Sequence, residues 1–204
     1  MFDPNHAVTV KPTTMGKLMY VQMSAIDVAE FERGRRQWED EKRRRANKAR
    51  TAVLRYSETR KPRGRKATLR AIRDCCLADG SGSRLAVLLS LIGLAPAEIF
   101  WPALINEWTR CDAAWGHRTS LLEGMENTGT ALPFFSRAQR QFFGTLPPQV
   151  QVYRGCSRTR VRAVAWTTDR SVAEGFARGH RGIRLPDPVV ASAVIPKEHI
   201  FFVT

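Results

Sequence analysis

Apolar and polar positions in the first 78 residues predict a start without clear period, followed by a mostly solvated helix. Residues 1–22 have no clear period, and we expect an extended, loosely ordered start there. Residues 23–78 change to a helical pattern dominated by charged residues and strong helix formers, with acid-to-base pairs four residues apart in the favourable order. Proline and glycine interrupt this basic helical segment over residues 60–67, where we predict a linker, a basic arm or both.

A second helical region is predicted over residues 84–145. Residues 85–94 are almost wholly apolar and have the length of a buried helix. After them, Pro102 can occupy the first turn of a longer helix that ends near residue 115 or 118. A tryptophan recurs at every seventh position, at Trp101, Trp108 and Trp115. We expect these rings in the core, because large aromatic residues at this period usually pack inside; exposed rings would instead indicate a docking face for another protein.

The pattern changes from helix to strand after residue 146. Val150 and Val152 alternate with polar neighbours and predict a strand that ends at Arg154. Residues 162–168 predict a second strand that ends in two hydroxyls, and Asp169 follows as a good N-cap for a short helix. An arginine at the end of one strand, with hydroxyls and a helix start at the end of another, can form a site for a phosphorylated ligand.

The last residues predict more strand. Residues 189–204 are expected to form two strands joined by a turn at residues 196–198. The sequence as a whole therefore predicts an α+β protein, with a mainly helical N-terminal half followed by a smaller, strand-rich part over residues 146–204.

Composition favours a cytoplasmic protein that neither binds a metal ion nor crosses a membrane. The chain has 204 residues and 23.0 kDa, which suits one domain or a small domain with an extension. Its longest uncharged central stretch, residues 85–97, is shorter than a membrane span, and its start has no secretory pattern. The four cysteines form no CxxC pair, so we expect free thiols rather than a zinc site or disulfides.

Nearly all of the net charge of +14 belongs to one segment. Residues 42–73 hold 14 Lys and Arg residues and a single acidic residue, Glu58. This segment predicts nonspecific binding of nucleic acid or another polyanion, which would weaken steeply with salt; the alternative is a solvated hinge. No aromatic residue interleaves with the arginines of residues 60–66, so no base-stacking surface is expected there.

Three short motifs carry a family resemblance: Tyr153-Arg154-Gly155, Trp166-Thr167-Thr168 and Ala173-Glu174-Gly175-Phe176-Ala177. In this order and spacing they resemble the first two signatures of the NAD-dependent mono-ADP-ribosyltransferases of the arginine–serine–glutamate class. The resemblance covers residues 146–204, under a third of the chain. It implies a mixed β-sheet and a transferase, of the glycosyltransferase kind, that passes ADP-ribose from its substrate NAD to an acceptor that the sequence does not identify.

The resemblance also implies roles for single residues. Arg154 is expected to grip a phosphate or the ribose of NAD, and Thr167 to support the site, so both are candidate catalytic residues. The expected NAD-binding set comprises Tyr153, Arg154, Gly155, Trp166, Thr167, Thr168 and Phe176. For Phe176 two interpretations stay open, stacking on nicotinamide and packing in the core, and packing in the core is the one that we expect.

The third signature of that family, a strand that carries the catalytic glutamate, is not found. Glu174 falls in the predicted helix and Glu198 in the predicted turn, and neither matches the family's position. We therefore expect an incomplete sheet, with residues 200–203 as an exposed apolar edge, and a 204-residue chain with weak or no transferase activity. The features fit bacterial or phage proteins of this kind. The alternative function is a basic protein that binds nucleic acid or another polyanion through residues 42–73.

Overall fold

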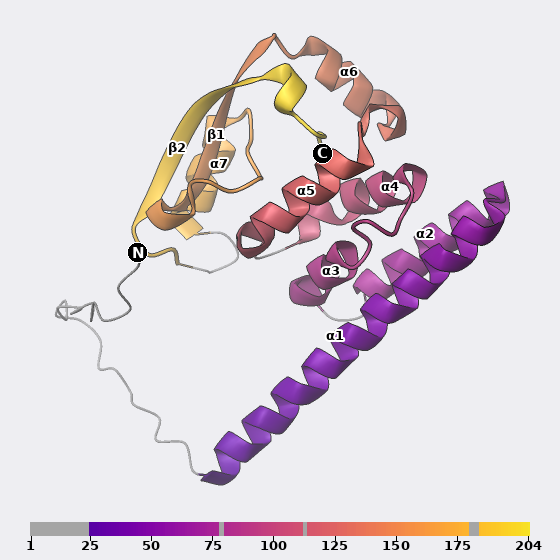
Figure 1. Ribbon diagram of the computed structural model, residues 1–204. Helices are drawn as coiled ribbons and strands as arrows, with labels where there is room; N and C mark the ends of the chain where they lie inside the picture. Colours follow the sequence, from indigo (N-terminus) through magenta and orange to yellow (C-terminus); the bar gives the residue numbers. More distant parts are fainter. Residues whose placement is uncertain (1–24, 78–79, 112–113, 180–183) are drawn as a thin grey trace, which may run out of the picture. The chain divides into compact units, whose positions relative to one another are not determined.

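The fold is α+β and mainly helical, as the sequence predicts (Figure 1). The chain divides into two units, Met1–Trp38 and Glu39–Thr204, and each is described by itself. The expected loosely ordered start at residues 1–22 lies outside the part that the computed structural model describes, which is residues 25–77, 80–111, 114–179 and 184–204. Within these ranges no helix is long and apolar enough to cross a membrane.

A long charged helix, α1 (Ala25–Thr59), takes part in both units. In the first unit, Arg33 lies 3.9 Å from Glu30 in an exposed ion pair. In the second, Glu41 pairs with both Arg44 and Arg45 at 2.7 Å. Pairs three and four residues apart lie on one side of a helix and support it. The charged helix that the sequence predicts is thus present.

The second helix, α2 (Pro62–Leu77), begins inside the predicted linker. The linker over residues 60–67 was therefore wrong in extent, since only residues 60–61 separate the two helices. Pro62 is the first residue of α2, where its missing N–H costs nothing and its fixed φ suits a helix. Arg60 turns the chain with a φ of 46°, and its N–H donates to Tyr56 O at 2.7 Å.

Four further helices with short 3-10 turns follow. They are α3 (Gly80–Leu89), α4 (Ala97–Glu107), α5 (Arg118–Thr128) and α6 (Arg137–Thr145), with η1 (Trp108–Arg110), η2 (Ala114–His117) and η3 (Leu132–Phe134). The apolar stretch at residues 85–94 is helical only as far as Leu89, after which a turn leads to Gly93 with a φ of 71°. A left-handed residue of this kind ends a helix and favours glycine.

Pro102 lies in the middle of α4 rather than in its first turn, so the predicted helix start was wrong. The helix begins at Ala97, after an N-cap at Pro96. A proline inside a helix leaves the carbonyl four residues earlier without its donor, and here that carbonyl belongs to Glu98. Arg65 of α2 donates from Nε to Glu98 O at 3.0 Å. This bond takes the place of the missing one and ties α2 to α4.

The apolar core lies among these helices. Trp101 is completely buried, together with neighbours of α3, α4 and α5 such as Leu88, Leu104 and Leu121. Trp108 is half-buried against the same core. The expectation that the tryptophans pack inside is confirmed for Trp101, while the side chain of Trp115 lies outside the described residues.

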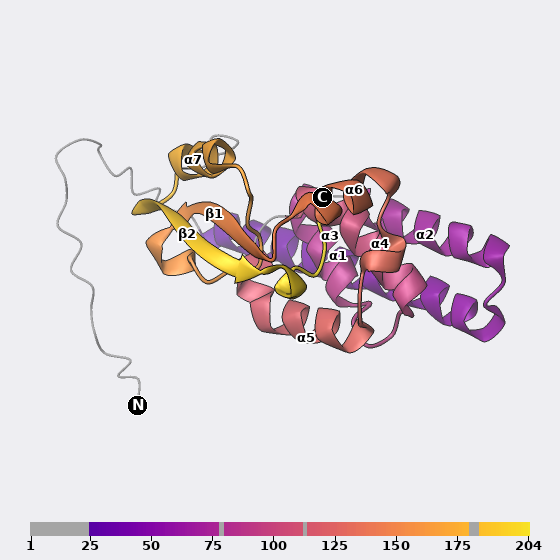
Figure 2. The same cartoon turned by 90° about the horizontal axis from the view of Figure 1, so that it is seen from above.

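The strand-rich part is a single antiparallel pair with one helix on it. Strands β1 (Gln149–Ser157) and β2 (Pro188–Pro196) pair in a register that sets Val152 opposite Ala193. Val150 and Val152 are buried, as their alternation predicts. Helix α7 (Arg170–Gly179) packs against β1, which Figure 2 shows from above. Among the described residues this sheet contains no parallel pair, so a mixed sheet is not observed.

Two of the predicted strands are wrong. Residues 162–168 form no strand, but contribute one isolated bridge between Tyr153 and Thr167. Their carbonyls bond to side chains instead: Arg154 donates to Ala165 O, and Trp166 Nε1 donates to Ala163 O at 2.9 Å. The segment therefore lacks the free backbone groups of a ladder.

The second wrong strand follows the predicted turn. A 3-10 turn, η5 (Lys197–His199), occupies that place, and residues 200–204 form no strand. Phe201 and Phe202 pack against the helical core instead. The exposed apolar edge expected at residues 200–203 is therefore absent, because these side chains find apolar partners in the helical region.

Candidate functional site

Some of the predicted site residues, among them Arg154, Gly155 and Thr167, lie in or beside the second half of β1. Arg154 sits on this strand, half-buried, with its guanidinium turned toward the segment that links β1 to α7. Its Nε donates to Arg160 O at 3.2 Å, and its Nη1 donates to Ala165 O. One side chain thus fixes both ends of the 160–165 segment. Sequence reasoning did not identify this role, because backbone acceptors leave no mark in the sequence.

A backbone bridge fixes Thr167 beside Tyr153. Tyr153 N donates to Thr167 O at 2.7 Å, and Thr167 N donates to Tyr153 O at 2.9 Å. The Thr167 hydroxyl accepts from Asp169 N at 3.1 Å, and it donates to no other residue in the described part of the chain. The hydroxyl proton of Thr167 therefore stays available for a ligand, whereas Thr168 is simply exposed.

Gly155 allows α7 to approach the strand more closely than any side chain would permit. A Cβ at this position would lie 1.8 Å from Ala173 O and 2.6 Å from Ala177 N. Real carbon atoms do not approach backbone atoms so closely, so any larger residue must displace the helix. The Tyr-Arg-Gly motif therefore has a packing reason for its glycine, which is close contact with the Phe-Ala turn of α7.

The side chain of Asp169 caps the N-terminus of α7. Asp169 Oδ1 accepts from both the N–H and the hydroxyl of Ser171 at 2.7 Å, as an N-cap should. These hydrogen bonds hold the pKa of Asp169 below its ordinary value. The sequence pattern is therefore confirmed for the cap, but the helix start is not free to bind an anion, since a carboxylate already occupies it.

Phe176 lies on the outer side of α7. Its side chain is 44% exposed, and that of Val172, one turn earlier, is 43% exposed. The expectation that Phe176 packs in the core is therefore wrong. The buried residue of α7 is Ala173, which is small because the backbone of the helix lies directly on Gly155. An exposed ring remains compatible with the other interpretation, contact with a ligand.

The charge of Arg154 has no acidic counterpart. Within the described ranges, no carboxylate lies at ion-pair distance from its guanidinium, and burial lowers the pKa of Arg154. Glu174 pairs instead with Arg170 at 3.0 Å and with Arg178 at 4.0 Å. The partners of this half-buried cation are two carbonyls and the thiol of Cys156. Without a carboxylate, it has an electrostatic reason to attract an anion.

The other predicted residues support this arrangement or lie elsewhere in the fold. Trp166 is half-buried and bonded to the linking segment, so it supports the site rather than lining it. Glu198 is exposed in η5 and lines a different cavity, next to Phe143 and Lys197. The four cysteines are free, and the described residues include no group of three or more His, Cys, Asp or Glu side chains that could hold a metal ion.

The arrangement is thus an arginine on a strand, a hydroxyl fixed beside the same strand, and a helix in close backbone contact. Comparison of the chain with protein-family models, curated proteins and solved structures finds no match in any of the three.

Proposed function

We propose that the chain binds NAD at the second half of β1, as an ADP-ribosyltransferase-like protein. The observation that carries this proposal is the half-buried guanidinium of Arg154, for which the described residues supply no carboxylate. Arginine binds phosphate oxygens with its planar fork, and two of its N–H groups are already used to fix its position. The pyrophosphate of NAD meets the remaining N–H groups, and the Thr167 hydroxyl donates to a neighbouring oxygen.

The transfer step needs more than binding. Cleavage of the bond between nicotinamide and ribose builds positive charge on the sugar, which a carboxylate must stabilise. Glu174 is engaged by Arg170 and Arg178, and Glu198 lies in η5. The residues described here therefore support NAD binding better than catalysis. ADP-ribose transfer to an acceptor, protein, nucleic acid or small molecule, is expected to be weak or absent in this 204-residue chain.

Calorimetric titration with NAD tests the proposal. Arg154→Ala is expected to weaken binding about ten- to a hundredfold, the usual value of a charge-assisted contact. Arg178→Ala removes the same charge from an exposed position of α7 and should leave binding unchanged. Nicotinamide release, followed in the same samples, is expected to stay near background.

Further variants separate the loss of a contact from the loss of the fold. Arg154→Lys keeps the charge without the fork and should bind NAD with intermediate affinity. Thr167→Val keeps the shape of the side chain and removes only its hydroxyl. Circular dichroism shows whether each variant is folded. A folded Arg154→Ala variant with unchanged affinity, or a parent chain that does not bind NAD at millimolar concentration, refutes the proposal.

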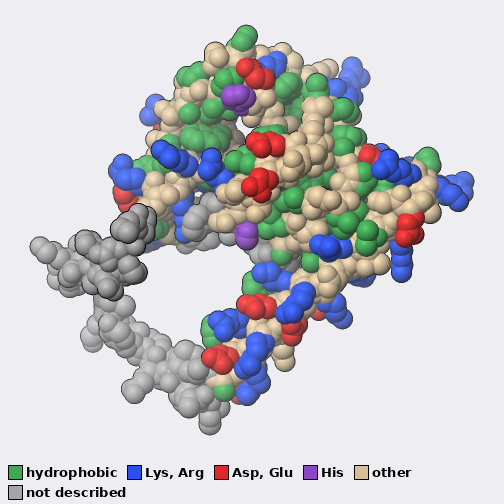
Figure 3. Space-filling view, in the orientation of Figure 1, with side chains coloured by type: hydrophobic (Ala, Val, Ile, Leu, Met, Phe, Trp, Pro, Cys, Tyr) green, Lys and Arg blue, Asp and Glu red, His purple; other side chains and the backbone are tan. Residues whose placement is uncertain are grey.

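A second function, binding of nucleic acid or another polyanion through residues 42–73, is favoured by a separate observation. Lys61, Arg63 and Lys66 are exposed, and none of them has an ion pair within the described residues. Along the visible face of α1, by contrast, Lys and Arg side chains are interspersed with Asp and Glu (Figure 3). Each phosphate contact that is lost should reduce the slope of log affinity against log salt by about one. A triple alanine variant of these three residues would therefore lower the slope by about three if all of them contact phosphate.

A further inference from the structure

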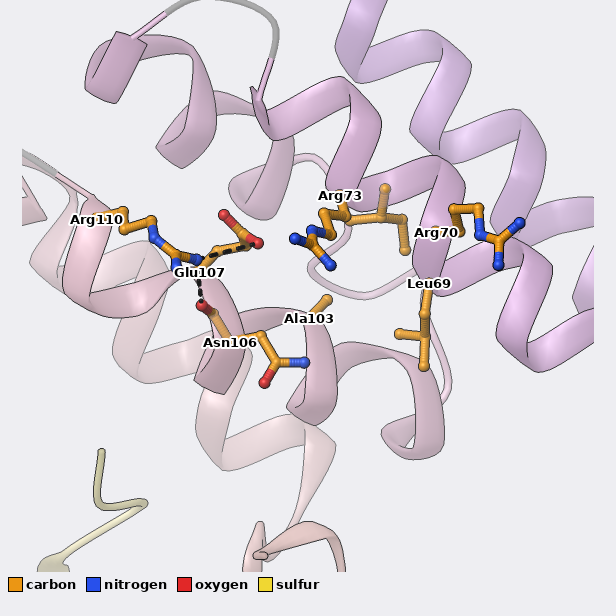
Figure 4. A pocket seen from close by; sticks show the side chains of 8 residues that line it. Leu69, Arg70, Arg73, Ala103, Asn106, Glu107 and Arg110 are labelled. Atoms are coloured by element: carbon orange, nitrogen blue, oxygen red, sulfur yellow. Dashed lines mark hydrogen bonds and ion pairs between the residues drawn. The ribbon is translucent and has the colours of Figure 1, made fainter.

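A cavity of about 490 Å³ lies between α2 and the end of α4, well within the unit Glu39–Thr204 (Figure 4). Its apolar wall comes from Leu69, Ile72 and Ala103. Its volume is typical of sites for small molecules. Arginines from both sides of the cavity dominate its polar lining: Arg70, Arg73 and Arg110.

The charges around this cavity are unequal. Arg70 and Arg73 have no ion pair in the described part of the chain. Glu107 is the acidic residue of the lining, and it is buried to 97%. Its Oε2 lies 3.1 Å from Arg84 Nε, a second buried group, so its charge is already matched. The cavity is therefore positive, and an anion would relieve the repulsion among its arginines.

Glu107 and Arg84 also hold the positive groups in place. Arg84 donates from Nη1 to Arg110 O at 3.0 Å, which fixes the 3-10 turn after α4. Arg110 Nη1 reaches Asn106 O at 3.4 Å and lies 4.0 Å from Glu107 Oε1. Figure 4 shows Arg73 pointing from α2 toward Glu107 and Arg110. The guanidinium groups of Arg73 in α2 and Arg110 in η1 thus approach the Glu107 carboxylate from two sides.

The buried pair of Glu107 and Arg84 is closed to a ligand. Glu107 Oε2 and Arg84 Nε are both inaccessible and lie 3.1 Å apart, so each serves as the charge partner of the other. The exposed amide of Asn106 lines the same cavity, and it can donate to an oxygen of a ligand.

We infer that this cavity binds a small phosphorylated molecule, with its phosphate bound by Arg73 and Arg110 and a further oxygen of the ligand near the amide of Asn106. A doubly charged phosphate matches several arginines better than a single carboxylate does, and arginine binds it through two parallel bonds. The concave, partly apolar wall fits a compact molecule rather than the continuous backbone of a nucleic acid. The inference does not depend on NAD binding at Arg154.

Calorimetric titration with pyrophosphate provides the test. Arg73→Ala and Arg110→Ala are each expected to weaken binding about tenfold or more, since each removes a charge-assisted contact. Arg137→Ala removes the same charge from an exposed position of α6 that does not line the cavity, and it should change the affinity less than about twofold. Pyrophosphate binding should persist in Arg154→Ala, which separates this cavity from the proposed NAD site.

A neutral variant makes the test independent of charge. Asn106→Tyr places a ring in the cavity while every arginine remains, and Asn106 is exposed, so the fold should tolerate it. It should abolish pyrophosphate binding without lowering the melting temperature. Equal losses in Arg73→Ala and Arg137→Ala, or full binding in Asn106→Tyr, would overturn the inference. The inference would also be overturned if the parent chain did not bind pyrophosphate but bound an oligonucleotide without terminal phosphate, and if Asn106→Tyr weakened that binding.

Discussion

Within the unit Glu39–Thr204, the helical region and the strand-rich region are each stabilised by a different kind of contact. In the helical region large side chains are fully buried, among them Phe100, Trp101 and Leu104. In the strand-rich region the main contacts involve the backbone: α7 lies on the bare Cα of Gly155, and the side chain of Arg154 is bound to two carbonyls. Burial of apolar area stabilises the helical region, whereas the contacts of the strand-rich region mainly hold polar groups in position.

The C-terminal residues connect the two regions. Phe202 lies edge-on to Trp108, with ring centroids 5.6 Å apart, and 6.2 Å from the ring of Trp101. Gln139 of α6 donates from Nε2 to Val203 O at 2.7 Å. Residues 201–203 therefore follow the strand-rich region in sequence but belong to the helical core by packing. This contact anchors the end of β2 and, through it, the strand that carries Arg154.

The largest expected effect comes from the core of the helical region. Trp101→Ala removes a fully buried ring and its contact with Phe202, and should lower the free energy of unfolding by about 3–5 kcal/mol. Chemical denaturation with urea measures this loss. If the two regions depend on each other, NAD affinity should fall in step with stability, because Phe202 loses its partner.

Trp101→Phe is the matched control for that change. The indole Nε1 of Trp101 is buried without a hydrogen-bond acceptor, so phenylalanine removes an unsatisfied donor while it keeps most of the apolar ring. Its cost should be well below that of Trp101→Ala. Equal losses in the two variants would show that shape, rather than buried area, governs this part of the core.

This difference in contacts explains why the helical region was easier to predict from the sequence than the strand-rich region. Side-chain burial leaves a periodic trace, so the apolar stretch of α3 and the core position of Trp101 could be predicted. Backbone contacts leave almost none. The strand expected at residues 162–168 was wrong because Arg154 binds a carbonyl within it, and the linker at residues 60–67 was wrong because Pro62 suits the first position of a helix.

The candidate site was predictable in its parts and not in its arrangement. The motif residues Arg154, Gly155 and Thr167 do come together, which their order in the sequence suggested. The cap at Asp169 was predicted, but its consequence, an occupied helix start, was not. The exposure of Phe176 could not be read from an amphipathic pattern, because the face that α7 buries is set by the close approach to Gly155.

The second prediction addresses that close approach. Gly155→Ala would place a methyl group 1.8 Å from Ala173 O, so α7 has to move away from β1. We expect a loss of about 3 kcal/mol, the upper end for overpacking, together with loss of NAD affinity. Gly175→Ala on the same helix meets no atom within 4 Å and should stabilise α7 by up to about 1 kcal/mol. If Gly155→Ala is tolerated as well as Gly175→Ala, the close packing of α7 on β1 is not what holds this region.

The smallest effect concerns the cap of α7 and depends on pH. Asp169→Ala removes the acceptor for Ser171 and should loosen only the first turn of α7, because the core of the helical region does not depend on it. The pKa of Asp169 is lowered by these bonds, so its contribution is fully present above the ordinary pKa of an aspartate, about 3.9. This contribution is lost as the pH falls through the lower pKa of Asp169 in the folded protein.

Hydrogen exchange of the α7 amides should therefore be faster in Asp169→Ala than in the parent chain at pH 6, once both are corrected for the intrinsic rate. The two should converge at the lowest pH at which the parent stays folded. Asp169→Asn, which keeps a capping oxygen without the charge, should retain most of the protection and show no such dependence on pH. A difference between parent and Asp169→Ala that persists unchanged in acid would mean that the side chain of Asp169 caps α7 without any contribution from its charge.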